Sequence, residues 1–497
     1  MALTPRMDPY ARLLFRLYEA LVLLSILRPV NGSHLITQLS SYTIQDARRR
    51  FLKNLCFLCD YKKGGDSTTA IAVEEREDCY VFWVSSNEGP GESVTRHLSD
   101  VLDHVQRFAS HSEDRVTSEE ALLVMCTAFA SLRIRQLIRI LRNAARRCRV
   151  SLEGAQNEHN DGVKNWLRSF EDQNSSELSM CRAAYRARND EELRQIEQLG
   201  QESEDTPGVM QTAPAFRAVK HMIGRLAAYI RAVSQLLDDG SRLRKLLMDY
   251  RIVYSVQCPA SAAVPEADPH TTLSGVLKRL LPNQDDRYPL YLRFLTHLDK
   301  QVHIESRLHK EFKSGKLEPG VHAEVQLLHH FYSERRQFAA KDRYIACSKP
   351  ACICCELYFR HHPAKVCLLD SHRRAYPNWG ILSLAGGADN PQWLEYRKTI
   401  NDVVGDLKFM FLDQISELRI LSCERQDTLT QITTSQGSVD GDSDSEMDTF
   451  ANSNNVESTT LYPDVNLNNT AGLQSLSLDV QVSSDDEVEI GSGATLL

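Results

Sequence analysis

Several features are scarce in this sequence, and each absence narrows the choice of class. No stretch reaches the roughly 18 to 20 consecutive apolar residues that a membrane-spanning helix needs, so we expect no membrane span. The apolar run Ala20–Leu27 follows Asp8 and Glu19 and stops at Arg28, which indicates part of a helix rather than a secretory signal. Thirteen cysteines in 497 residues fall below the density of disulfide-stapled secreted proteins. We therefore expect an intracellular protein, cytoplasmic or nuclear.

Basic residues are missing from one long segment. Residues 426–497 contain 13 Asp and Glu but no Lys or Arg, whereas the whole chain has a formal charge of −8. The remaining 425 residues carry 58 Lys and Arg against 53 Asp and Glu, so this part is mildly basic at +5. Ser, Thr, Asn and Asp dominate the acidic segment, which predicts a disordered tail. Its serines among acids are candidate phosphorylation sites, and the tail is a candidate surface for protein partners.

Strand signals nearly vanish between Ser93 and about Arg307, and this long segment separates the predicted parts of the chain. A chain of this length exceeds what one hydrophobic core normally serves. We predict five parts: an N-terminal helical segment, a β-hairpin, a helical region, an α/β domain and the disordered tail, at residues 1–65, 66–91, 92–305, 306–425 and 426–497.

The hairpin prediction rests on two short runs. Thr68–Val73 and Cys79–Val84 are rich in branched and aromatic residues and are joined by a polar break. A second candidate for the start of the sheet is Arg251–Val256, and the sequence leaves both placements open. Residues 200–214 and 258–270 are expected to be exposed loops.

The helical region is predicted from apolar residues that recur with helical spacing. Its helical segments are 98–108, 118–147, 191–199, 215–237, 243–250 and 274–281. Leu132–Cys148 carries six arginines, which allows a phosphate-binding face. A solvated face over an apolar stripe is the more ordinary interpretation, and no aromatic residues interleave the arginines.

The segment after Gly320 alternates between helical and strand-like patterns. We predict helices at 321–335 and 351–361, and buried strands at 344–347 and 366–370. Residues 402–419 are expected to supply a further strand and a closing helix. Such alternation is typical of an α/β sheet with parallel pairs.

Four side chains in this segment form a candidate zinc site. His322, Cys352 and Cys355 would provide three ligands and leave a fourth position for water, while Glu324 would move protons beside it. Each ligand-bearing segment is at the start of a predicted helix, and Cys352 and Cys355 are three residues apart, so both sulfurs share one helical face. Cys354 is a rival thiol, but its spacing from Cys352 points the two sulfurs apart.

Beyond these four residues, the motif order resembles a known family. His322-Ala323-Glu324, Cys347-Ser348-Lys349 leading to Cys352 and Cys355, and the downstream stretch from Ser371 through Pro377 to Trp379 resemble the OTT-type nucleic acid/nucleotide deaminase-like family, which is expanded in fungi. The resemblance covers about residues 306–412. It implies the cytidine deaminase-like fold, a three-layer α/β/α sandwich around a mixed sheet. If the hairpin opens that sheet, the helical region is inserted into it; if Arg251–Val256 opens it, the helical region precedes it.

The resemblance also implies roles for individual residues. His322, Cys352 and Cys355 would be zinc ligands, and Glu324 the catalytic proton shuttle. The sequence departs from the superfamily at Ala351, which stands between Pro350 and the first ligand cysteine.

Three residues outside the zinc motif are candidate substrate contacts. If the hairpin belongs to the sheet, Asn87 falls where cytidine deaminases often present an Asn to a ribose. His372 and Trp379 follow the predicted strand 366–370, where a loop could cover the pocket, and Trp379 could stack on a base. A loop anchored by buried Trp379 and Tyr376 is the alternative interpretation.

Two hypotheses about function follow from these residues. The first is a zinc-dependent hydrolytic deaminase that uses a zinc-activated water and Glu324 on a nucleobase in a nucleoside, nucleotide or nucleic acid. The second is a catalytically inactive deaminase-like zinc scaffold or interaction protein. Glu324 favours the enzyme, because a scaffold has no need of an acid beside the metal.

Overall fold

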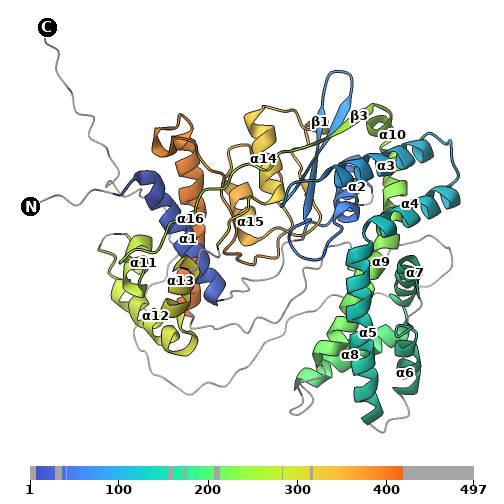
Figure 1. Cartoon of the computed structure of the whole chain (residues 1–497), viewed down its shortest axis with the longest axis horizontal. Helices are drawn as coiled ribbons and strands as arrows, with labels where there is room; N and C mark the ends of the chain where they lie inside the picture. The colour runs from blue at the N-terminus through green and yellow to red at the C-terminus, as the bar shows by residue number, and fades with distance from the viewer. Residues whose placement is uncertain are drawn as a thin grey trace, which may run out of the picture. The chain divides into compact units, whose positions relative to one another are not determined.

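The chain is mostly helical around one small sheet (Figure 1). The structure, a computed structural model, describes residues 7–27, 36–40, 42–154, 160–172, 175–205, 213–282, 284–313 and 317–417. The predicted tail, 426–497, lies outside these residues. Among the described residues no single helix is long and apolar enough to cross a membrane; the neighbouring helices α4 (Arg115–Phe129) and α5 (Ser131–Gly154) meet that test only together, across an 82° bend.

Four strands of the described chain form the sheet in the order β3-β2-β1-β4. Strands β1 (Thr69–Glu75) and β2 (Tyr80–Ser86) make the predicted antiparallel hairpin, in which Ile71 is opposite Val84. Strand β3 (Tyr250–Ser255) pairs in parallel with β2, and β4 (Ala346–Cys347) pairs antiparallel with β1. Both predicted placements of the first strands therefore belong to the same sheet, and they are not alternatives.

Helices cover the two faces of the sheet. One face, with α2 (Ile44–Cys59), carries the helical insert between β2 and β3. The insert comprises α3 (Glu92–Ala109), α4, α5, α6 (Asp161–Arg168), α7 (Glu177–Ala187), α8 (Glu191–Asp205), α9 (Ala213–Arg242) and α10 (Arg244–Met248). The long helix α9 packs against α2, α5, α7 and α8. We call α2 and this insert the helical layer.

The opposite face carries the helices that follow β3, together with α1. They are α1 (Pro9–Leu27), α11 (Leu273–Leu280), α12 (Tyr288–Val302), α13 (Ile304–Lys313), α14 (Ala323–Ser333), α15 (Ile353–His361) and α16 (Trp393–Ser416). In Figure 1, α14 and α15 lie on the other side of β1 from α2 and α9. We call this the metal-side layer, for the site described below.

The side chains of β1 and β2 alternate between the two layers. Ala70 and Ala72 of β1 face the metal-side layer, whereas Ile71 and Val73 face the helical layer. This is the two-residue period of a strand whose two faces are both buried. It explains why the hairpin reads as a nearly continuous apolar run.

Two predictions for the C-terminal part are wrong. Residues 366–370 make no strand; Cys367 N–H donates to Arg343 O at 2.9 Å, and the following Ser371 forms an isolated parallel bridge with Ala351. Within 402–416 no strand precedes a closing helix, because α16 covers that stretch. The predicted parallel pairing is present between β2 and β3, whereas β4 pairs antiparallel with β1.

The loops and some helices also differ from the sequence expectations. Residues 258–270 lack helix and strand, as predicted, but α8 continues to Asp205 and shortens the predicted loop 200–214, of which 206–212 lie outside the described residues. Helices α6, α7, α12 and α13 were not predicted.

Several arginines of the helix α5 are paired with neighbouring acids. Arg133 is buried and pairs with Asp60 at 3.0 Å, and Arg149 pairs with Glu171 at 2.9 Å. Arg135 pairs with Glu177. These pairs favour the interpretation of α5 as a charged outer face over that of a phosphate-binding surface.

Candidate metal centre

The first ligand candidate stands at the start of α14. His322 is the N-cap residue, with an extended backbone (φ −67°, ψ 148°), and its side chain makes no capping bond. The ring is therefore free to turn away from the helix. The first turn is held by β2 and the loop after it: Ser85 Oγ–H donates to Ala323 O at 2.7 Å, and Ala323 N–H donates to Asn87 Oδ1 at 2.8 Å.

The two sulfur ligand candidates stand at the start of α15. Cys352 is the N-cap residue, and its Sγ accepts the N–H of Cys355 at 3.5 Å. Their spacing of three residues places both sulfurs on one side of the helix start, as predicted. Cys354 is fully buried but its sulfur does not join the group.

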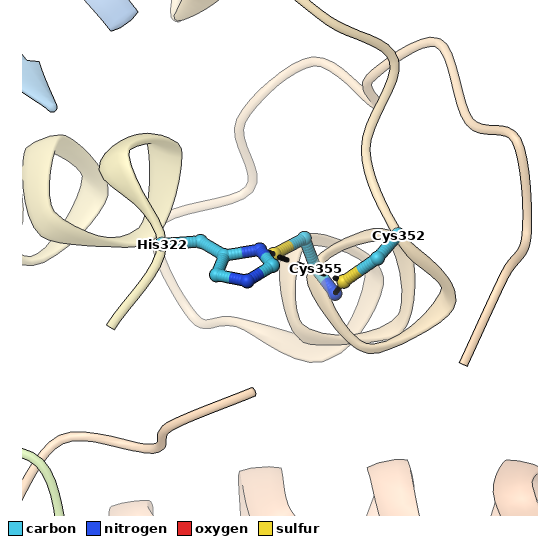
Figure 2. A group of neighbouring side chains, drawn as sticks. All are labelled: His322, Cys352 and Cys355. Carbon is cyan, nitrogen blue, oxygen red and sulfur yellow. Dashed lines mark hydrogen bonds between the residues drawn. The ribbon is translucent and has the colours of Figure 1, made fainter. Parts of the chain in front are cut away.

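These ligand atoms converge on one point (Figure 2). His322 Nδ1 lies 3.3 Å from Cys355 Sγ and 3.7 Å from Cys352 Sγ. All three ligand atoms lie within 4.8 Å of one another, and no other group of three His, Cys, Asp or Glu in the described part of the chain meets this closely. Bond lengths of about 2.0–2.1 Å to nitrogen and about 2.3 Å to sulfur at a tetrahedral zinc imply a nitrogen–sulfur separation of about 3.6 Å. The observed spacings bracket this value.

Electrostatics in the group favour a charged sulfur. Burial would raise the pKa of Cys352, but the Cys355 side chain and the His322 ring lower it to about 6. Burial would lower the pKa of His322, but the charge of Cys352 raises it to about 9. Both shifts favour a thiolate at Cys352 beside a protonated His322. A metal ion would replace the imidazolium proton, because a histidine ligand binds in its neutral form.

Glu324 lies beside the ligand group and outside it. Its carboxylate is 4.0 Å from His322 Nδ1 at the nearest oxygen, and the side chain is 3% exposed. Its other oxygen accepts the Cys347 Sγ–H at 3.8 Å. A buried carboxylate beside a set of ligand candidates is placed to exchange protons with a water bound there. Because Glu324 lies outside the set, it does not close the site as a fourth ligand would.

The candidate substrate residues differ in exposure. Asn87 is half-buried, and its amide is engaged on both ends, accepting from Ala323 N–H and donating to Gly65 O at 2.9 Å. His372 is buried and its Nδ1 accepts Arg374 N–H at 3.0 Å. The proposed contacts of Asn87 and His372 with substrate stay predictions.

Trp379 occupies a different place from the one expected for a stacking residue. It is fully buried, and its indole N–H donates to Cys355 Sγ at 3.1 Å. The interpretation as a buried loop anchor fits this position, and a base cannot reach the indole face without displacing the loop. The aromatic ring that remains accessible is Tyr376, which is 39% exposed and lies 6.5 Å from the His322 ring, centroid to centroid. The alternative interpretation of a loop anchored by buried Trp379 and Tyr376 is therefore confirmed for Trp379 and wrong for Tyr376.

The other cysteines and histidines near the site stay outside the ligand group. His330 Nε2 accepts a bond from Arg336 Nε–H at 2.9 Å, and its ring packs on Trp83. Cys347 contacts Glu324, and none of Cys347, His329, His330 or His372 joins the ligand group. The open fourth position predicted for zinc is compatible with this arrangement.

A comparison with family models points to the same segment of the chain. Residues 321–383 match the family model described as OTT_1508_deam:-like deaminase. This segment is deaminase-like. It contains all three ligand candidates, Glu324 and Trp379, so the match and the convergent side chains point to the same part of the chain. No curated protein and no solved structure matches the chain.

Proposed function

We propose that this protein is a zinc-dependent hydrolytic deaminase that acts on a nucleobase in a nucleoside, nucleotide or nucleic acid. One observation carries the proposal: His322, Cys352 and Cys355 converge from two helix starts, with the buried carboxylate of Glu324 beside them. The match of residues 321–383 to a deaminase family supports the same reaction class.

The residues fit zinc in donor type, number and spacing. One imidazole and two thiolates are donors that zinc favours, and three protein ligands are the number found in catalytic zinc sites. Zinc would supply a Lewis acid that lowers the pKa of water at its open position. The positive ends of α14 and α15 would stabilise the thiolates and any developing negative charge.

Glu324 would move the protons of the reaction. Its carboxylate would accept a proton from the attacking water and deliver protons to the ring nitrogen and then to the departing amino group. A C–O bond forms and a C–N bond breaks, so that water is consumed and ammonia leaves. The Cys347 thiol donates to one carboxylate oxygen and so orients the group.

The substrate would bind at the mouth formed by the His322 ring and the loop after residue 370. We assign base stacking to the exposed ring of Tyr376 in place of Trp379, because aromatic rings stack on unpaired bases. Asn87 and His372 would contact the sugar or base from the two sides of this mouth.

A second candidate function is a catalytically inactive zinc scaffold that presents the helical layer and the acidic tail to protein partners. The extent of the helical layer, which supplies most of one face of the molecule's core, favours this alternative. Only the enzyme needs Glu324, so the two candidate functions predict different effects of replacing it.

The decisive experiment measures bound zinc and ammonia release on a panel of nucleosides, nucleotides and single-stranded DNA and RNA. We expect one zinc per chain, and a Glu324→Gln variant that keeps its zinc while the rate falls by about 10²–10⁴. Zinc at one equivalent with no ammonia from any substrate class, in either protein, would favour the scaffold.

The ligand assignment is tested in the same preparation. Cys355→Ser should abolish zinc binding, and the matched variant Cys354→Ser should retain it, since both thiols are fully buried and only Cys355 joins the group. Loss of zinc in Cys354→Ser alone would show that the assignment is wrong.

A further inference from the structure

Trp379 touches a metal-ligand candidate directly, and neither the proposed reaction nor the family match gives it a role. We propose that Trp379 is a positioning residue of the metal centre: its indole N–H fixes the sulfur of Cys355, and its loop fixes the approach to His322. The proposal rests on the zinc site proposed above and does not depend on catalysis.

The contact between Trp379 and Cys355 has the features expected of one that holds a ligand side chain in position. The indole nitrogen lies 3.1 Å from Cys355 Sγ, and both side chains are fully buried. A thiolate ligand in such a place has no water to solvate it, so a buried N–H is its natural partner. The Tyr358 ring, on the same helix as Cys355, lies 6.2 Å from the indole, centroid to centroid.

The backbone around Trp379 reaches the other ligand helix. Residue Gly320, two positions before His322, forms a parallel bridge with Trp379. Gly320 N–H donates to Asn378 O at 3.0 Å, and Gly380 N–H donates to Gly320 O at 2.8 Å. One short loop therefore contacts the chain that leads into α14 and the sulfur at the start of α15.

The close approach of this loop depends on glycine. A Cβ atom added at Gly380 would lie 2.8 Å from the carbonyl carbon of Gly320, which is too short for a real contact. The loop and the segment before His322 are thus packed backbone to backbone. Displacing the loop would move the indole away from Cys355 and loosen the path to His322.

The test compares two tryptophans that each lose an indole hydrogen bond. In Trp379→Phe the lost acceptor is Cys355 Sγ, and in the matched control Trp166→Phe it is Asp190 Oδ2 in the helical layer, at 2.8 Å in the parent protein. Zinc affinity would be measured by competition with a chelator, and the sulfur-to-metal charge-transfer bands would be recorded with Co²⁺ as a probe.

We expect Trp379→Phe to bind zinc about 10–100-fold more weakly and to shift the Co²⁺ bands, with no change in the control. Equal affinity and identical bands in Trp379→Phe would overturn the proposal, as would a parent protein that binds no zinc. A parent protein that binds zinc but releases no ammonia contradicts only the proposed function, because both readouts here are independent of activity.

A second measurement covers a variant that fails to fold. The indole N–H resonances of the parent protein, labelled with ¹⁵N at tryptophan, would be followed as zinc is added. One of them should shift strongly, because its acceptor becomes a metal ligand. If no indole resonance responds to stoichiometric zinc, the positioning role is wrong.

Discussion

The two faces of strand β1 carry side chains of different size. On β1, Ala70 and Ala72 meet the metal-side layer, whereas Ile71 and Val73 meet the helical layer. Strand β2 does not repeat this difference, because Trp83 meets the metal-side layer and Val84 the helical layer. The layer with the candidate metal site therefore packs against small side chains on β1, and the difference in size belongs to this strand rather than to the whole sheet.

One buried acid joins the two faces. Asp60 ends α2 in the helical layer, yet it accepts from Ser348 Oγ–H at 3.3 Å and pairs with Lys349 at 3.1 Å in the loop that leads to Cys352. It also pairs with Arg133 of α5. The loop that leads to Cys352 is therefore anchored by a residue of the opposite layer.

Replacing that acid should give the largest effect on stability. Asp60→Ala leaves Arg133 and Lys349 without their carboxylate, and breaking a buried pair by removing one partner costs about 3–5 kcal/mol of unfolding free energy. Urea unfolding would measure the change. Arg135→Ala, which removes an exposed pair with Glu177, is the control and should cost less than about 1 kcal/mol. Similar costs for both variants would show that the layers are not joined at Asp60.

Acid should weaken the helical layer through His97. Burial lowers the pKa of His97 to about 4, so the folded protein keeps this ring neutral while the unfolded chain takes up a proton near pH 6.5. Its contribution is complete above pH 6.5 and is lost as the pH falls to about 4, to a total of about 3 kcal/mol.

The measurement is the unfolding free energy between pH 7 and pH 4. In His97→Phe the decline over this window should be smaller by about 3 kcal/mol than in the parent protein, because the group that titrates is gone. The exposed His297 of α12 offers the control, replaced by Phe in the same way. An unchanged pH dependence in His97→Phe would contradict the assignment.

Enlarging the small side of β1 should have the smallest effect of the three. Ala72→Leu forces α14 away from the strand, and overpacking of this kind costs about 1–3 kcal/mol. Val73→Leu on the other face changes volume by one methylene in a region of larger side chains, so we expect less than about 1.5 kcal/mol. Thermal unfolding of both variants would rank the faces, and zinc affinity should fall only in Ala72→Leu. The reverse order would invert the comparison.

The grouping of the three ligand candidates could be predicted from the sequence because its signals are local. His322 and Cys352 each begin a helix, and three-residue spacing puts Cys352 and Cys355 on one side. The position of a side chain at the start of a helix is determined by the few residues around it. The spacing alone does not predict that the two helix starts meet at one point. That prediction also used the resemblance to a family.

What the sequence missed depends on partners distant along the chain. Residues 366–370 have the apolar pattern of a strand, but burial alone does not provide the ladder that defines one. The apolar residues of 402–417 alternate weakly with polar ones, and this pattern suggested a strand. The stretch belongs to the helix α16, which packs against α1. The bond from Trp379 to Cys355 spans 24 positions, and nothing in either residue's neighbourhood specifies the other.

The pairing of β1 with β4 sets a constraint on how the protein is made. Ala70 pairs with Cys347, so the edge of β1 has no partner until more than half of the chain has followed it. At roughly 5–20 residues per second, a ribosome would take roughly 15–55 s to synthesise the intervening residues. During this time the hairpin and the helical layer can form, but the free edge of β1 stays open to other chains. The sheet is consequently completed late in synthesis, and the nascent chain is the form in which this edge is most exposed to wrong pairing.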